Sequence, residues 1–235
     1  MHVDRAGLSP SDVGMIDRHA VVARHNVEFN IPAGRLELGN GEFCFVADGT
    51  GFQTFQGITM SHWGWHSFPL PEGRTKGKVP ASGTFQKGRN TGGDNFPAGT
   101  EKIQEWMHDN PHKFNLGRIS LRRMNGGYLK EAEITDLSRT LDLWSGIQIS
   151  RYRIDGQWVH VETCVHPVQD MVAFRIESAL LECGQLEVML DFPYPSLARA
   201  PQGGDFENVD GHRTGVIFPG HNRADFKRQI DETLY

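Results

Sequence analysis

The chain has very few cysteines. Only Cys44, Cys164 and Cys183 occur among its 235 residues, and they lie far apart. Their odd number and wide spacing exclude the disulfide framework that stabilises many small secreted domains. A sparse count is compatible with a reducing compartment, but many large secreted proteins also lack disulfides. The localisation therefore stays open between the cytoplasm and secretion followed by removal of a signal peptide.

Long hydrophobic runs and an excess of positive charge are also missing. The longest apolar runs fall far below the roughly 20 residues that a membrane-spanning helix needs, so we expect no membrane association. Lysine and arginine together number 24 against 29 aspartates and glutamates, which gives a formal net charge of -5. This balance argues against sequence-independent binding of a polyanion, and we expect no nucleic acid partner.

The motifs of several enzyme classes are absent. The chain has no Gly-x-Ser-x-Gly segment, no phosphate-binding loop and no dinucleotide-binding fingerprint after a strand. Glycoside hydrolysis needs two carboxylates, one as acid and one as base or nucleophile. Candidate carboxylates are present, but none stands in a diagnostic motif: Glu105, Asp142, Glu162 and Asp191. We therefore assign no catalytic residue to this chain and expect no cofactor.

Two histidines could be considered as metal ligands. His62 and His66 have the spacing that places two imidazoles on one face of a helix, with Asp48 or Glu72 nearby in the sequence. However, Gly64 lies between the histidines and makes the segment a poor helix. No third ligand stands at a diagnostic spacing. We therefore expect hydrogen-bonding histidines in a polar loop and no metal site.

What the sequence does contain is a repeated β-strand pattern. From Gly117 onward, short stretches of Val, Ile, Phe and Tyr alternate with polar residues, and turn residues separate them. The clearest hairpin joins Ile147–Ile154 to Trp158–Val165 through Asp155-Gly156, a dipeptide that favours a type I′ turn. A change of parity within the first of these strands predicts a bulge near Ser150 or Arg151.

The remaining elements complete the fold prediction. Further strands are expected at 119–121, 172–176, 186–192 and 215–218, and a short helix at Lys102–Asp109 with Thr100 as its N-cap. About ten strands are too many for one flat sheet, so we predict an all-β fold, a large two-sheet antiparallel β-sandwich with one or two short helices. Residues 1–15 are interpreted as an N-terminal extension, and residues 16–235 as one domain.

The most informative segment spans residues 36–68. Glycines at its turns frame a strand pair, which leads into a loop that carries His62, Trp63, Trp65 and His66. Indole rings can lie flat against the C–H face of a sugar or a base, and imidazoles can donate or accept hydrogen bonds. These four residues are therefore our candidate substrate-binding residues. The alternative, that both tryptophans close the end of a hydrophobic core, stays open.

Two segments of the chain resemble a known family. Residues 16–68 contain IDRHAVVARHN, LGNGEFCFVADGTGFQTF and TMSHWGWHSFP, and residues 139–178 contain RTLDLWSGIQISRYRIDGQWVHVETCVHPVQDMVAFRIES. Both resemble the N-terminal β-supersandwich domain that precedes the (α/α)6 barrel of six-hairpin glycoside hydrolases, a group that includes maltose-phosphorylase-like and α-fucosidase-like enzymes. The residues that carry the resemblance are Gly39-Asn40-Gly41, Leu141-Asp142-Leu143, the Asp155-Gly156 turn and His166-Pro167-Val168-Gln169-Asp170.

The resemblance implies a galactose-mutarotase-like supersandwich, with sugar-bond cleavage performed by carboxylates of the helical barrel. After Phe192 the chain shows only loops and strands, and it stops at RQIDETLY, which has the pattern of a strand beginning. We therefore expect a non-catalytic N-terminal domain of a glycoside hydrolase, truncated before the barrel. Its expected partners are a C-terminal helical barrel of the same polypeptide and a carbohydrate, either an oligosaccharide or a glycoside.

Two other functions are compatible with the same residues. The chain could be an independent carbohydrate-binding module that uses the tryptophan loop without a partner domain. It could also be a mutarotase-like epimerase, because such enzymes share the supersandwich architecture and use a histidine with a carboxylate for proton transfer at the anomeric centre. His160 and Glu162 lie on one face of a predicted strand and would be the candidates for that reaction.

Overall fold

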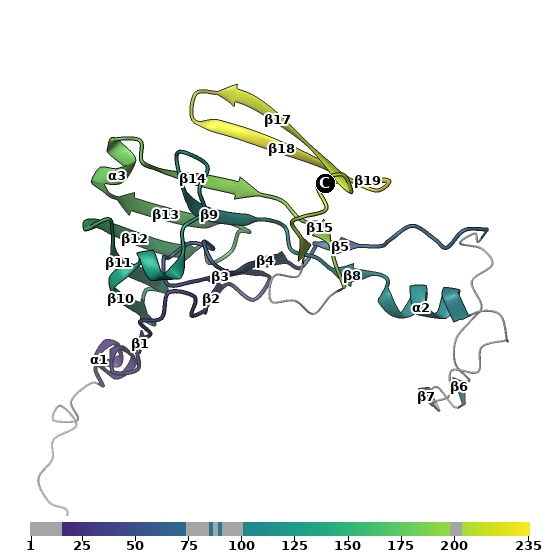
Figure 1. The fold of residues 1–235 in the computed structure, drawn as a ribbon. Coiled ribbons are helices and arrows are strands. Elements are labelled where there is room, and N and C mark those ends of the chain that lie inside the picture. Colours follow the sequence, from purple (N-terminus) through teal and green to yellow (C-terminus); the bar gives the residue numbers. More distant parts are fainter. Residues whose placement is uncertain (1–15, 74–84, 87–88, 91–100, 198–203) are drawn as a thin grey trace, which may run out of the picture.

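The computed structural model describes residues 16–73, 85–86, 89–90, 101–197 and 204–235. Strands account for 46% of the structure and helices for 12%, so the all-β prediction is confirmed. The strand pairs among the described residues are antiparallel, and they are arranged as a sandwich-like body (Figure 1). The predicted extension at residues 1–15 and the proposed N-cap Thr100 lie outside the described residues.

The largest sheet has five strands in the order β1-β10-β11-β12-β13. Its strands are β1 (Val27–Glu28), β10 (Thr135–Asp142), β11 (Ile147–Ile154), β12 (Gln157–Val165) and β13 (Val172–Glu177). The predicted hairpin is formed by β11 and β12, and only Asp155 and Gly156 lie between them. Their φ angles of 51° and 77° are both positive, as a type I′ turn requires.

The bulge predicted near Ser150 or Arg151 is wrong. The pairing of β11 with β12 runs without interruption, and the register shift lies in β10, between Thr135 and Ser138. The change of parity has a different cause, because the buried face of β11 carries polar residues at its start. Gln148 on that face donates to Asp48 O at 3.2 Å and to Ser150 Oγ at 3.3 Å.

The other strands form smaller sheets, so the sandwich is divided more finely than the predicted two sheets. One has three strands, namely β2 (Leu36–Gly39), β3 (Phe43–Ala47) and β4 (Ile58–Ser61). Another pairs β9 (Arg118–Arg123) with β14 (Leu186–Asp191). A third contains β17 (His212–Gly220), β18 (Arg223–Ile230) and β19 (Thr233–Leu234). The segment RQIDETLY therefore holds the end of one strand and all of the next.

Short ladders and helices complete the described structure. The two-residue ladders pair β5 (Trp65–His66) with β8 (His112–Lys113), β6 (Phe85–Gln86) with β7 (Arg89–Asn90), and β15 (Tyr194–Pro195) with β16 (Gly204–Asp205). The helices are α1 (Arg18–Ala23), α2 (Glu101–Asp109) and α3 (Ala179–Glu182), with a 3-10 turn at Glu131–Glu133. The helix predicted at Lys102–Asp109 is α2, and none of the described helices is long and apolar enough to span a membrane.

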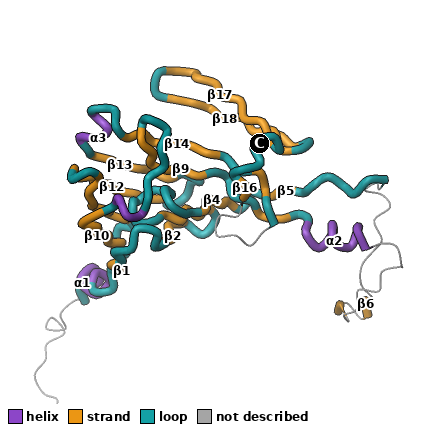
Figure 2. The backbone as a smooth tube through the Cα atoms, in the orientation of Figure 1, coloured by secondary structure: helices purple, strands orange, loops and turns teal. Residues whose placement is uncertain are grey.

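The main hydrophobic core lies between the five-stranded sheet and the β9–β14 pair (Figure 2). The five-stranded sheet contributes Tyr152 and Val161 to this core, and the β9–β14 pair contributes Leu121. Phe52 comes from the loop between β3 and β4, and its ring stacks on Phe174 at a centroid distance of 4.6 Å. The core thus joins both layers, as a sandwich requires.

The loop between β3 and β4 is held in the core by Asp48, which is fully buried. Its Oδ1 accepts from the backbone N of Thr50 at 2.9 Å and from the hydroxyl of the same residue at 2.6 Å. Its Oδ2 accepts from the backbone N of Phe55 at 2.6 Å and of Gln56 at 3.3 Å. Burial raises the pKa of Asp48 to about 6, although these hydrogen bonds favour the charged form.

Candidate functional site

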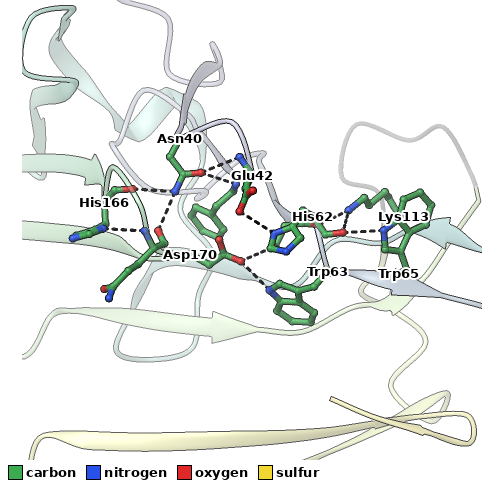
Figure 3. Close-up of polar contacts among 11 residues, drawn as sticks. Asn40, Glu42, His62, Trp63, Trp65, Lys113, His166 and Asp170 are labelled. Carbon is green, nitrogen blue, oxygen red and sulfur yellow. Dashed lines mark hydrogen bonds and ion pairs between the residues drawn. The ribbon is translucent and has the colours of Figure 1, made fainter.

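Two turns that are far apart in the sequence meet in space (Figure 3). Asn40, in the turn between β2 and β3, donates through Nδ2 to the backbone O of His166 and of Gln169, both at 3.1 Å. Its Oδ1 accepts from the backbone N of Glu42 at 3.0 Å and of Phe43 at 2.8 Å. One amide side chain therefore joins two of the four motifs that carry the family resemblance, and we call this arrangement the Asn40 clasp.

The clasp also places Asp170 against the tryptophan loop. Its Oδ2 accepts from Trp63 Nε1 at 2.9 Å and from the hydroxyl of Ser61. Trp63 itself is half exposed, with 49% of the residue accessible to solvent. Because its only polar group is already hydrogen-bonded, the surface that Trp63 offers to a ligand is the apolar ring.

Trp65 is held in a similar way on the neighbouring strand. Its Nε1 donates to the backbone O of His62 at 2.8 Å, and Lys113 Nζ lies 4.6 Å from the centroid of its ring. Lys113 is itself fixed by donation to the backbone O of Ser61 at 2.6 Å and of His62 at 2.5 Å. Trp65 is 48% exposed, so neither tryptophan closes the end of the hydrophobic core.

A groove of about 530 Å³ adjoins this loop over the outer face of β2, β3 and β4. Its lining includes Glu37, Glu42, Cys44, Met60, His62 and Lys113. His62 is exposed there, and its Nδ1 lies 3.6 Å from Glu42 Oε2. Burial, followed by the charge of Glu37, raises the pKa of the Cys44 thiol. Cys44 is therefore a poor nucleophile, and the groove offers carboxylates, an imidazole and an ammonium as hydrogen-bonding groups.

His66 faces the interior, although it lies next to Trp65 in the sequence. The alternation of side chains along β5 exposes Trp65 and buries His66, which is only 2% exposed. Its Nδ1 lies 2.9 Å from Tyr235 Oη, and its Nε2 lies 3.0 Å from Asp231 Oδ2. The structure thus brings His62, Trp63 and Trp65 together on the surface and separates His66 from them.

His66 belongs to a chain of hydrogen bonds that includes Tyr235 and Asp231. Tyr235 Oη donates its only proton to the backbone O of Trp65 at 2.8 Å, so His66 Nδ1 must be the donor to Tyr235. Tyr194 Oη donates to Asp231 at 3.0 Å, and burial together with Asp231 raises the pKa of Tyr194 to about 12. His66 Nε2 and Tyr194 Oη thus converge on the carboxylate of Asp231, at 3.0 Å each.

The sequence candidates for metal binding and catalysis are dispersed. His62 is exposed, His66 is buried, and Asp48 is enclosed in its own loop. Within the described part of the chain, no group of three or more His, Cys, Asp or Glu side chains could hold a metal ion. Asp191 pairs with Arg118 at 2.6 Å, which gives this carboxylate a structural partner.

The pair considered for epimerase chemistry lies on the outer face of β12. His160 Nε2 is 3.9 Å from Glu162 Oε1, and His160 Nδ1 is 3.8 Å from Glu177 Oε2. Arg175 Nη1 lies 3.8 Å from the second carboxylate oxygen of Glu162. These groups form a charged cluster across β12 and β13, at distances longer than direct hydrogen bonds.

Several residues of the site had no assigned role at the sequence level. Asn40 and Asp170 belong to the quoted motifs, but Asn40 contacts residues 126 and 129 positions away, and Asp170 contacts Trp63, which is 107 positions away. Lys113 follows a helix and a proline and has no sequence signal, because its position depends on the β5–β8 ladder.

Comparison of the sequence with protein-family models gives no match, and comparison with curated proteins gives no significant match. The functional interpretation therefore depends on the residues and geometry described above.

Proposed function

We propose that this chain is a non-catalytic β-sandwich domain of a glycoside hydrolase that presents Trp63 and Trp65 to carbohydrate. In this proposal it packs against an (α/α)6 catalytic barrel of the same polypeptide and supplies one wall of the sugar site. The observation that carries the proposal is the exposure and hydrogen bonding of the two indoles. Each is about half exposed, and each has its N–H already hydrogen-bonded within the protein.

Such an arrangement suits a sugar for a physical reason. A pyranose offers a flat patch of C–H groups that packs on an aromatic ring, and its hydroxyls need hydrogen-bonding groups at the edge of that ring. Asp170 lies at the edge of Trp63, and Glu42 and His62 lie in the adjoining groove. Because the indoles are fixed before a ligand arrives, little conformational entropy is lost when it binds.

A second candidate is an independent carbohydrate-binding module. The observation that favours it is that the tryptophans and the polar groups around them all belong to this chain. Calorimetric titration of the chain alone with glucose-containing and fucose-containing oligosaccharides separates the two candidates. A module should bind measurably without a partner domain, whereas a domain that supplies one wall should show no calorimetric binding by itself.

The test of the tryptophan surface compares matched variants. Trp63→Ala and Trp65→Ala should each weaken carbohydrate binding about tenfold, or lower kcat/KM by a similar factor in a polypeptide that carries the barrel. Trp158→Ala is the control, because Trp158 is also 48% exposed and has Arg153 Cζ 4.2 Å from its ring centroid. Unchanged binding and kcat/KM in both loop variants would remove the loop from the sugar site.

A further inference from the structure

A second cavity, of about 400 Å³, lies on the side of β5 that carries His66. It is lined by residues 67–70, by Trp106 of α2, by the turn at residues 231–232 between β18 and β19, and by Thr233 at the start of β19. Trp63 and Trp65 are not among the residues that line it. The cavity is therefore separate from the proposed sugar surface and can be tested independently of it.

One wall of this cavity is aromatic and rigid. Trp106 Nε1 donates to the backbone O of Phe68 at 2.9 Å, and Asn110 Oδ1 accepts from the backbone N of Phe68 at 2.6 Å. The Phe68 ring also stacks on His112 at a centroid distance of 4.7 Å. Because the indole N–H is already used, this wall offers π-electron density to a ligand and no further donor.

Another part of the lining is acidic. Asp231 is held by His66 and Tyr194, but among the described residues its Oδ1 receives only the longer contact from Tyr194, at 3.2 Å, and so keeps acceptor capacity. Glu232 is exposed and makes no hydrogen bond or ion pair with any residue that the structure describes. No cationic side chain of the described cavity lining therefore lies opposite the carboxylate of Glu232.

The lining also contains no opposing charge. Among the described residues that form the cavity there is no lysine or arginine. A phosphate or carboxylate ligand would find the hydroxyls of Ser67 and Thr233 but no cationic partner, and the carboxylates of the lining would repel it. A neutral polyol would gain hydrogen bonds but would bring no positive charge to pair with Glu232. A cation gains from both parts of the lining, because aromatic faces and carboxylates each attract it.

We propose that this cavity binds an alkylammonium group, either a protonated amine or a quaternary ammonium, between the Phe68–Trp106 wall and the Asp231–Glu232 turn. The cation lies against the ring faces, and Glu232 supplies the balancing charge at the opening. Asp231 contributes a fixed acceptor, because His66 and Tyr194 prevent its side chain from turning away.

Choline is a suitable probe, and 3,3-dimethylbutan-1-ol is its neutral isostere. The two compounds have the same shape, so any difference in affinity reports recognition of the charge. Binding is followed by NMR at the indole N–H of Trp106, which is assigned from the signal that is lost in Trp106→Phe. We expect choline to shift this signal and to bind about tenfold more tightly than the alcohol.

Two charge-neutralising variants complete the test. Glu232→Gln should weaken choline binding about fivefold, because it removes the charge and keeps the shape of the side chain. Glu105→Gln is the matched control, since Glu105 is an exposed carboxylate of α2 that does not line the cavity. Trp63→Ala should leave choline binding unchanged, so that failure here is distinguishable from failure of the sugar proposal.

The proposal is overturned by any of three results. Equal affinity for choline and the alcohol would show an apolar pocket without charge recognition. Equal weakening by Glu232→Gln and Glu105→Gln would show a general effect of net charge. Absence of a Trp106 shift at saturating choline would show that the cation does not enter the cavity.

Discussion

Asp48 is a buried carboxylate whose four hydrogen-bond donors all belong to the loop that follows it. Its pKa is about 6 in the folded protein and 3.8 as the ordinary value, so between these values the folded state binds more protons than the unfolded state. The stability that protonation contributes is fully present below about pH 4 and is lost as the pH rises through about 6.

This pH dependence can be measured with Asp48→Asn. We expect the free energy of unfolding of the unmodified protein to rise relative to this variant by about 2 kcal/mol between pH 7 and pH 4, at roughly 1.4 kcal/mol per pKa unit. Urea unfolding at several pH values provides the measurement. Asp142→Asn is the control, because hydrogen bonds from Ser145 lower the pKa of the partly exposed Asp142 and reverse the sign. A gap for Asp48→Asn that does not change with pH would contradict this account.

The neighbouring residues His66 and His112 differ in the number of hydrogen bonds that their rings make. Both ring nitrogens of His66 are bonded, whereas neither nitrogen of His112 has a partner among the described residues, and the ring centroids lie 5.8 Å apart. His66→Phe should therefore lower the free energy of unfolding by about 3 kcal/mol, because Asp231 keeps Tyr194 but loses His66, its partner in a largely buried pair. His112→Phe should cost less than about 1 kcal/mol, because no hydrogen bond is lost.

The same pair makes a prediction about pH. Burial, and then the proximity of His66, lowers the pKa of His112 below its ordinary value of 6.5. The folded state therefore binds fewer protons than the unfolded state below that pH, and the stability due to neutral His112 is lost as the pH falls. The unmodified protein should lose stability relative to His112→Phe on acidification below 6.5.

Equal loss of stability in His66→Phe and His112→Phe at neutral pH would be incompatible with the described hydrogen bonds.

At the scale of the elements, the Asn40 clasp joins the β2–β3 turn to the turn after β12. Asn40→Asp keeps the oxygen that accepts from Glu42 and Phe43 but replaces the donor to His166 and Gln169 with a second oxygen. Two carbonyls would then face a carboxylate, and we expect a loss of about 1–2 kcal/mol in the free energy of unfolding. The environment of Trp63 should change as well, because Asp170 would no longer be held in place.

A matched control for the clasp is available in another turn. Asn125 Oδ1 accepts from the backbone N of Gly127 at 3.0 Å, and Asn125→Asp keeps this acceptor without breaking a tertiary contact. Its stability should stay within about 0.5 kcal/mol of the unmodified protein. If chemical denaturation gives the same loss for Asn40→Asp and Asn125→Asp, the clasp does not contribute through its donor.

The strands were more predictable from the sequence than the site. Alternation of apolar and polar residues located β11 and β12, because each buries one face along its own length. It also located β13 and β14, although the apolar face of β13 is only partly buried and Val188 and Leu190 of β14 are exposed. The bulge was misplaced because Gln148 and Ser150 occupy buried positions, where Gln148 donates to Asp48 O in a distant loop and to Ser150 Oγ on the same strand. An alternation pattern cannot reveal such a partner, since it reads polarity as exposure.

In the candidate site, too, some residues could be predicted from the sequence and others depended on distant partners. The sequence identified His62, Trp63 and Trp65, because their glycine-framed segment is unusual in composition. It did not separate them from His66, whose partners Asp231 and Tyr235 lie 165 and 169 positions further along the chain. Lys113 depends on the two-residue ladder between β5 and β8, which is too short to produce a periodic signal.

At the scale of the whole molecule, the loop that carries Trp63 and Trp65 is held by residues from distant parts of the sequence. The loop is fixed on one side by Asp170 and on the other by Lys113, and the buried neighbour His66 ties it to the β18–β19 turn. The proposed sugar surface and the proposed alkylammonium cavity therefore lie on opposite sides of one short strand. This placement makes β5 the element whose integrity both proposals require.

The central claim is that carbohydrate contacts the exposed indoles of Trp63 and Trp65. The most direct measurement is an NMR titration of the indole N–H signals with glucose-containing and fucose-containing oligosaccharides, because NMR also detects contacts too weak for calorimetry. We predict that the signals of Trp63 and Trp65 shift in a saturable way, while those of the other exposed tryptophans, Trp144 and Trp158, stay in place. Unmoved Trp63 and Trp65 signals, or equal shifts in all four, would contradict the account.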